Sequence, residues 1–227
     1  MLENHYQDLL KAHKLFRQIE GRWKFYDEYM KYADRSVWMK SAEIPLHQAM
    51  LLFGFIQSWD PNFQGDLTKF LIIYERIFPI INKYSDESLI TIDFSKEVKK
   101  DISIIFDSIT YCPIKRRREW TDTSKILHAI LPNLFVMWDI AIRNNYVGEE
   151  CDGNCYSNIF MPKMKELAIT YLDSFLIDHG GTYESANQKI TLMAEDTTLA
   201  KIIDEFNFVR YTRKKSLEEI QNITLNS

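Results

Sequence analysis

Residues 121–139 contain a lysine and an aspartate that could act together in catalysis. Their sequence is TDTSKILHAILPNLFVMWD, which places Lys125 early in one expected helix and Asp139 at the start of the next, with Pro132 between them. The positive end of a helix dipole opposes the charge of a nearby lysine and favours its neutral, nucleophilic amine, provided that the side chain is also shielded from water. Free amides at the next helix start would keep Asp139 ionised, so that it could stabilise a developing cation or orient a water molecule.

Both residues also have a structural interpretation, which the sequence favours. Asp139 is a typical helix cap, and Lys125 could form a buried or bridging ion pair. His128, one turn after Lys125, could join the pair on one helix face, although packing or capping is the more common role for such a histidine. Trp138 is expected in the core. We therefore expect Lys125 and Asp139 to be catalytic only if the protein is an enzyme, and we favour a protein without catalytic activity.

Two blocks of basic residues are the second candidate site. The formal net charge is -4, from 28 basic and 32 acidic residues, so any site for a polyanion must be local. Basic loops supply affinity for DNA or RNA through phosphate contacts, without reading the sequence. Solvated loop or helix-end charges are the alternative. The predicted nucleic-acid-binding residues are Lys125 and the two blocks, Lys115, Arg116, Arg117, Arg118 and Arg210, Arg213, Lys214, Lys215.

Other classes of site find little support in the sequence. The three cysteines, Cys112, Cys151 and Cys155, are too few for a disulfide framework, and a loop disulfide or inert thiols fit better than a metal site. We expect no metal and no cofactor. Residues 1–11 lack the basic-then-apolar pattern of a secretory signal, and the longest apolar stretch, residues 49–56, is too short to cross a bilayer. A cytoplasmic protein with no membrane partner is expected.

The hydrophobic pattern predicts an all-α fold. Hydrophobic residues make up 46% of the chain, whereas only 7 glycines and 6 prolines are present, which suits long helices. Apolar residues recur every three or four positions in most of the chain. We predict a compact bundle of about seven to nine helices in a single domain, residues 1–227, with two helical lobes around a cleft as one arrangement. The expected helices are 2–33, 45–56, 66–79, 95–109, 121–131, one from 139, 164–179 and 196–209, with 146–158 as a loop.

The hydrophobic pattern also predicts which helix faces are buried. The first helix is expected to bury His13 on its apolar stripe and to expose Phe25, Tyr29 and Tyr32 on the opposite face, where they would suit a protein interface. Residues 46–56 are apolar nearly all round, which predicts a central helix surrounded by others.

The Ser-Lys-x-Leu order at residues 124–127, the proline-containing loop and the apolar-aromatic-Asp order ending at Asp139 resemble the second half of the helix-hairpin-helix signature in the GPD superfamily of DNA glycosylases. In that family the lysine attacks the sugar C1′ of bifunctional members, and the aspartate supports glycosidic cleavage. The resemblance implies a glycosylase-like scaffold in which Lys125 and Asp139 hold these positions. Residues 119–124 lack the glycines of the family's phosphate-gripping hairpin, the separation of 14 residues is shorter than usual, and no four-cysteine cluster follows.

The chain is also similar to a group of prokaryotic helical proteins of about this length, in which a Ser-Trp turn such as Ser58-Trp59 precedes a Lys…Asp segment. A composition rich in Ile and Lys is typical of archaeal proteins. We interpret the chain as a non-catalytic nucleic-acid-associated protein with a larger protein partner, plausibly an accessory subunit of an Argonaute-type antiviral defence complex. The alternatives are a base-excision DNA glycosylase/lyase that uses Lys125 and Asp139, and a pure protein-interaction module.

Overall fold

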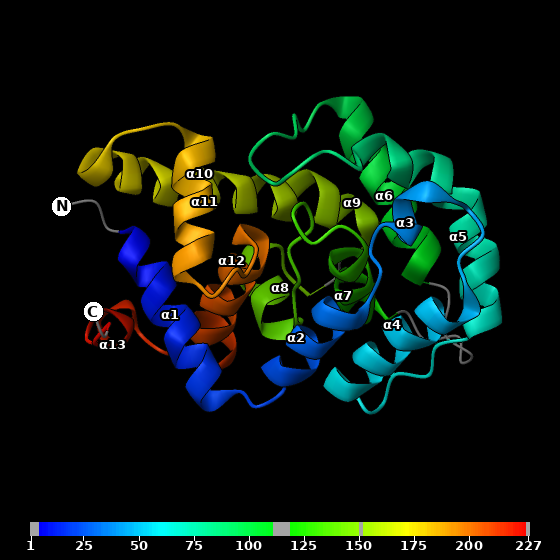
Figure 1. The fold of residues 1–227 in the computed structure, drawn as a ribbon, viewed down its shortest axis with the longest axis horizontal. Helices are drawn as coiled ribbons and strands as arrows, with labels where there is room; N and C mark the ends of the chain where they lie inside the picture. The colour runs from blue at the N-terminus through cyan, green and yellow to red at the C-terminus, as the bar shows by residue number, and fades with distance from the viewer. Residues whose placement is uncertain (1–4, 111–118, 150–151, 226–227) are drawn as a thin grey trace.

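The chain folds into helices joined by short turns (Figure 1). The computed structural model describes residues 5–110, 119–149 and 152–225, and these ranges contain no β-strand. The α-helices are α1 (Tyr6–Ile19), α2 (Trp23–Tyr32), α3 (Val37–Lys40), α4 (Leu46–Trp59), α5 (Leu67–Ile81), α6 (Lys96–Thr110), α7 (Trp120–Ile130), α8 (Ile140–Tyr146), α9 (Gly153–Cys155), α10 (Met161–His179), α11 (Tyr183–Met193), α12 (Leu199–Asn207) and α13 (Leu217–Gln221). A 3-10 turn, η1 (Asn82–Tyr84), and two π-helical turns, η2 (Tyr156–Phe160) and η3 (Phe208–Thr212), complete them.

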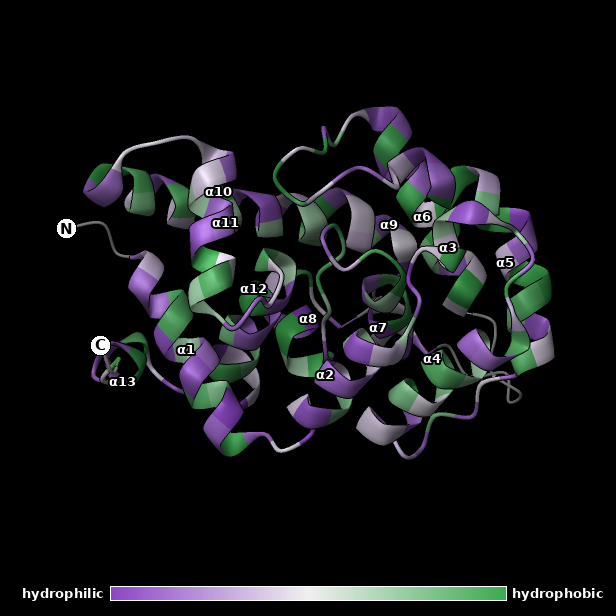
Figure 2. Cartoon of the chain, in the orientation of Figure 1, coloured by the Kyte–Doolittle hydropathy of each residue, from purple (hydrophilic) through white to green (hydrophobic). Residues whose placement is uncertain are grey.

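The all-α prediction is confirmed. Among the described residues, ten α-helices have seven or more residues, close to the seven to nine expected. The short turns follow from local capping: Asp66, Asp139, Thr182 and Thr198 each accept a hydrogen bond from the first turn of the helix that follows. Figure 2 shows hydrophobic and hydrophilic residues in alternating blocks along the outer helices, as expected for amphipathic helices that bury one face.

The helices form two groups that differ in their place along the chain. The terminal group contains α1 and α10–α13, in which α1 packs on α12, α13 and α10. The central group contains α2–α7, in which α5 packs on α6, α6 on α7, and α4 on both α2 and α7. In Figure 1, α1, α11 and α13 lie at the left and α3, α5 and α6 at the right. Buried side chains from both groups form one continuous core; the single-domain assignment stays a prediction.

The predicted helix over residues 2–33 is wrong in one respect, because it breaks at Glu20. The chain there is extended (φ -120°, ψ 96°), which ends α1 and lets α2 leave in a new direction. Gly21 follows directly, and glycine disfavours a helix interior. The expected burial of His13 is confirmed, since its side chain is 6% exposed. The expected exposed aromatic face is only partly right: Phe25 is 50% exposed, whereas Tyr29 is buried in the core.

Three further expectations are corrected. The helix predicted over residues 45–56, which is α4, is not surrounded by other helices, because Leu46 and Met50 on one of its faces are each 58% exposed. The last long helix is capped by Thr198 rather than by Asp196, whose backbone is left-handed (φ 60°). The expected loop at residues 146–158 becomes helical from Gly153 onward, because Asp152 caps α9 with hydrogen bonds from two backbone amides.

Candidate functional site

A serine on α7 brings the two candidate catalytic residues together. The Ser124 hydroxyl accepts a hydrogen bond from the Trp138 backbone N–H at 3.1 Å. The Trp138 indole N–H also donates to the Trp120 carbonyl at 3.1 Å. The segment after Pro132 is therefore fastened to the first two turns of α7, and the residue that follows Trp138 is Asp139. Local sequence thus fixes Asp139 beside the helix that carries Lys125.

Lys125 and Asp139 line the same pocket, which has a volume of about 200 Å³. The pocket lies where the two helix groups meet. Trp59 and Lys125 come from α4 and α7 of the central group, whereas Asp204 lies on α12 of the terminal group and Phe208 on η3, which directly follows α12. The lining residues are Arg22, Trp59, Thr121, Lys125, Met137, Trp138, Asp139, Ile142, Asp204, Phe208, Thr212 and Arg213. The sequence predicted two of these as catalytic and one further residue, Arg213, as nucleic-acid-binding.

The Lys125 side chain is shielded from water, with only 10% of its surface exposed. Its Nζ lies 2.8 Å from Oδ1 of the fully buried Asp122, one turn earlier in α7. Because α7 begins at Trp120, Lys125 stands in the second turn, where the helix dipole acts less strongly than at the terminus. The predicted ion pair is therefore present, and its acidic partner is Asp122.

Asp139 is the helix cap that its sequence position predicts. Its Oδ1 accepts a hydrogen bond from the Ile142 backbone N–H at 2.9 Å, and its Oδ2 accepts one from the Thr212 hydroxyl. The second contact ties the start of α8 to η3, 73 residues later in the chain. Both carboxylate oxygens of Asp139 are thus held in place by hydrogen bonds. The residue lines the same pocket as Lys125.

Two arginines at the pocket share one buried carboxylate. Glu20, at the break between α1 and α2, accepts hydrogen bonds from Nε and Nη2 of Arg22, both at 2.7 Å, and from Nη2 of Arg213 at 3.0 Å. Arg22 also donates to the Trp59 carbonyl at 2.9 Å. The hydrogen bond from Arg22 lowers the pKa of Glu20 to about 2, although burial opposes this shift. Glu20 therefore stays ionised at any ordinary pH.

This arrangement predicts a pH dependence of stability that Glu20→Gln should reduce. Because the pKa of Glu20 is lower in the folded chain, its contribution is fully present above the unfolded pKa of 4.5 and is lost as pH falls toward about 2. Solvent screening of the two half-exposed arginines limits the contribution to about 1 kcal/mol. Urea denaturation at pH 7, 5, 4 and 3 measures it: the wild type should lose more stability than Glu20→Gln below pH 4.5. Parallel losses in both proteins would contradict the assignment.

Buried charges continue beneath the pocket. Lys201, which is completely buried, lies 2.7 Å from Asp204 and 3.5 Å from Glu205, and Glu205 lies 2.5 Å from Nδ1 of His13. Burial raises the pKa of Asp204 to about 6, although Lys201 acts in the opposite direction. Burial also opposes ionisation of Glu205, but Lys201 and His13 together hold its pKa below the usual range.

His128 does not join Lys125 and Asp139 in the pocket. It is completely buried on α7, with Nε2 2.9 Å from the Tyr26 hydroxyl and Nδ1 2.6 Å from the Phe135 carbonyl. Burial lowers its pKa to about 3, so the imidazole is neutral at physiological pH. The packing role expected for this histidine is the one that it has.

The predicted basic blocks contribute only in part. Residues 115–118, which include Lys115 and Arg116–Arg118, lie outside the described residues. In the second block only Arg213 lines the pocket. Lys215 pairs with Glu219 at 2.9 Å, Arg210 donates to the Lys215 carbonyl at 3.4 Å, and Lys214 is exposed in a left-handed conformation (φ 56°). The block is a turn partly neutralised by acids rather than an open positive surface.

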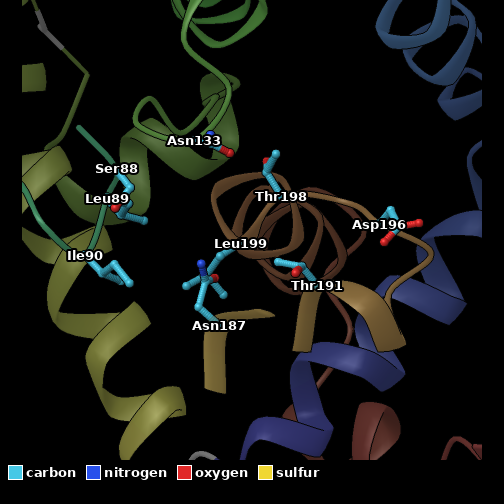
Figure 3. A pocket seen from close by; sticks show the side chains of 9 residues that line it. All are labelled: Ser88, Leu89, Ile90, Asn133, Asn187, Thr191, Asp196, Thr198 and Leu199. Atoms are coloured by element: carbon cyan, nitrogen blue, oxygen red, sulfur yellow. The ribbon is translucent and has the colours of Figure 1, made fainter. Parts of the chain in front are cut away.

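One other pocket is less suited to a polyanion. A second pocket, of about 250 Å³, lies between residues 88–90, the turn at Asn133, α11 and the start of α12 (Figure 3). Asp196 is its only charged lining residue, so nothing there would attract a polyanion. Within the described ranges, no three His, Cys, Asp or Glu residues could hold a metal ion, and no helix is long and apolar enough to span a membrane. Cys112 and Cys151 lie outside those ranges.

Sequence reasoning did not find Arg22, Asp204 or Thr212. Arg22 stands within the helix predicted for residues 2–33, where a charged residue reads as solvated surface. Asp204 and Thr212 reach the pocket only through tertiary packing of α12 and η3. Besides the Lys125…Asp139 segment, the Ser-Trp turn was a local signal that pointed to this region, since Trp59 lines the pocket.

Comparison of the chain with protein-family models, with curated proteins and with solved structures gives no match in any of the three. The functional argument therefore depends on the geometry of the pocket.

Proposed function

We propose that the pocket receives a single nucleotide turned out of a DNA strand and that the protein acts there as a base-excision glycosylase/lyase. The observation that carries this proposal is that Lys125 and Asp139, predicted separately as nucleophile and charge stabiliser, line one pocket. Enzymes that act on a base must take it out of the stack and into such a pocket. The site thereby supports the enzyme alternative more strongly than the non-catalytic interpretation that the sequence favours.

The shape and lining of the pocket suit this substrate. Its volume of about 200 Å³ is below the roughly 300–1,000 Å³ typical of sites for drug-sized ligands, which favours one base or sugar over a larger molecule. Trp59, Met137 and Phe208 offer apolar and aromatic surface against which a base can pack. Arg22 and Arg213 place positive charge at the same pocket, where the strand would continue past its wall.

The reaction follows from the contacts of Lys125. Asp122 accepts a proton from the ammonium group, 2.8 Å away, and the neutral amine attacks the aldehyde C1′ of an abasic deoxyribose. Loss of water gives a protonated imine between Nζ and C1′. Transfer of a C2′ proton to solvent water then lets the electron pair of that C–H bond form the C2′–C3′ double bond, while the C3′–O bond breaks and the 3′ phosphate leaves with its electron pair. The Asp139 carboxylate stabilises the positive charge at C1′.

A second candidate is the non-catalytic nucleic-acid-associated protein, an accessory subunit of a larger nucleoprotein complex. The observation that favours it is the ion pair between Lys125 and Asp122, since an ionised partner keeps a lysine charged and unreactive. The exposed apolar side chains Leu46 and Met50 on α4, and Phe25 and Tyr32 on α2, would suit a protein partner.

Borohydride trapping on abasic DNA separates the two candidates. The purified protein is incubated with labelled single- and double-stranded DNA and RNA over a salt series, and borohydride is added to a set that contains an abasic site. We expect a covalent adduct with abasic DNA, because borohydride reduces the imine to a stable amine. Salt-sensitive binding without an adduct would support the accessory role instead, and a complete lack of binding would contradict both.

A further inference from the structure

The proposed function leaves open what holds the DNA backbone, because residues 119–124 contain no glycine and so lack the usual hairpin for gripping a phosphate. Arg22 and Arg213 offer a different answer. Both line the pocket, yet they are 191 positions apart in the sequence and meet only because Glu20 binds both. Their side chains remain 41% and 44% exposed, whereas that of Glu20 is 5% exposed.

The charges of this cluster do not cancel. Two guanidinium groups share one carboxylate, which leaves one positive charge in excess within this group of three side chains, although the carboxylates of Asp139 and Asp204 line the same pocket. Hydrogen bonding to Glu20 raises the pKa of Arg22, and Asp60 and Asp139 act in the same direction, so this arginine is always charged. Glu20 accepts from Nε and Nη2 of Arg22, and Nη1 donates to the Trp59 carbonyl, which leaves two of the five Arg22 N–H groups, one on Nη1 and one on Nη2, without these acceptors. A guanidinium has five N–H donors, and the Arg213 contact with Glu20 uses Nη2 alone.

Both guanidinium groups are also held in place by neighbouring rings. The Arg213 guanidinium carbon lies 5.2 Å from the centre of the Phe208 ring, and that of Arg22 lies 5.8 Å from the Trp59 ring. Such packing and the shared carboxylate reduce the freedom that each arginine would lose on binding a ligand. Two oriented forks with donors to spare are suited to a tetrahedral oxyanion, because guanidinium geometry matches phosphate.

We propose that Arg22 and Arg213, oriented by Glu20, bind the phosphodiester next to the nucleotide that enters the pocket. The proposal rests on the proposed function for the identity of the strand, but the anion site itself does not depend on Lys125 chemistry. Arg22 and Arg213 are binding residues, and Glu20 is a positioning residue.

The test compares Arg213→Ala with Lys69→Ala, a matched change of an exposed basic residue on α5 that neither lines the pocket nor belongs to a predicted binding block. Each protein is titrated with a duplex that carries a reduced abasic site, with either native phosphates or one uncharged methylphosphonate beside that site. We expect Arg213→Ala to bind the native duplex roughly tenfold more weakly, with a salt slope reduced by about 1. The methylphosphonate should weaken the wild type similarly and leave Arg213→Ala unchanged. Lys69→Ala should behave as wild type.

Inorganic phosphate provides an independent readout by NMR of the arginine Nε–H signals. We expect phosphate to shift the Arg22 and Arg213 signals in the wild type, and to shift the remaining Arg22 signal much less in Arg213→Lys, because the lysine keeps the charge but not the fork. Equal DNA affinity of the two alanine variants, with no phosphate shift, would overturn the proposal. A trapped adduct alongside that result would leave the lyase function standing, whereas a phosphate site without an adduct would remove the lyase function alone.

Discussion

Replacement of Lys125 by methionine or by arginine is expected to abolish the adduct trapped with abasic DNA. Neither side chain can form the imine at C1′, so the yield should fall by roughly 100-fold or more, the scale of losing a positioned catalytic group. The two variants differ in what they leave behind: methionine removes the charge that pairs with the buried Asp122, whereas arginine retains it. Quantifying the adduct by denaturing gel over time, at matched fractions of folded protein, measures the effect.

The Asp139 variants separate chemistry from folding at the same site. Asp139→Asn keeps an oxygen that can accept the Ile142 N–H but loses the negative charge, so adduct formation should slow while stability changes little. Asp139→Ala should in addition cost about 1 kcal/mol of unfolding free energy, the usual value of a helix cap.

An adduct that survives in Lys125→Arg at the wild-type yield would show that another amine reacts, and the role given to Lys125 would then be withdrawn.

The sequence predicted this part of the site because its signals are local. Pro132 marks the end of α7, and the aspartate three residues before the amide of Ile142 marks the start of α8. Ser124 and Trp138 complete the arrangement, and their hydrogen bond joins residues only 14 positions apart. Interactions over such short separations leave a pattern that helix-capping rules can recognise.

The remainder of the site depends on contacts that leave no local pattern. Glu20 ends α1 and pairs with Arg213, a residue 193 positions away. Because the hydrophobic periodicity continues past Glu20, it predicted one helix where the structure has a break. The interpretation of α4 failed for a similar reason. An apolar helix has no polar face to show which side meets solvent, and only the packing of α2, α5 and α7 against it leaves Leu46 and Met50 exposed.

Lys201 shows most strongly how tertiary packing changes the meaning of a charged residue. In the sequence it is one lysine in an amphipathic helix, but in the fold it is completely buried, 4.6 Å from the centre of the Phe16 ring and 5.0 Å from that of Trp59. Its ammonium offsets the charges of Asp204 and Glu205. Asp204, which lines the pocket, is thereby paired with the ammonium of Lys201, which is completely buried and so cannot contact a ligand.

Lys201→Met is therefore expected to lower the free energy of unfolding by about 3–5 kcal/mol at pH 7, because it removes the cation from a buried ion cluster and leaves Asp204 without its partner, while Glu205 keeps only His13. Urea denaturation measures the loss, and Lys189→Met, at an exposed position on α11, should change stability by less than about 0.5 kcal/mol.

The pH dependence identifies the cause of that loss. Lys201 lowers the pKa of Asp204, which is about 6 in the wild type, so its removal raises that pKa further and lets Asp204 bind a proton at higher pH. The penalty should shrink as pH falls from 7 to 5, since protonation removes one uncompensated charge. Adding Asp204→Asn to Lys201→Met should recover part of the stability at pH 7 for the same reason. A loss below about 1 kcal/mol that does not change with pH would mean that packing, and not charge compensation, accounts for the buried lysine.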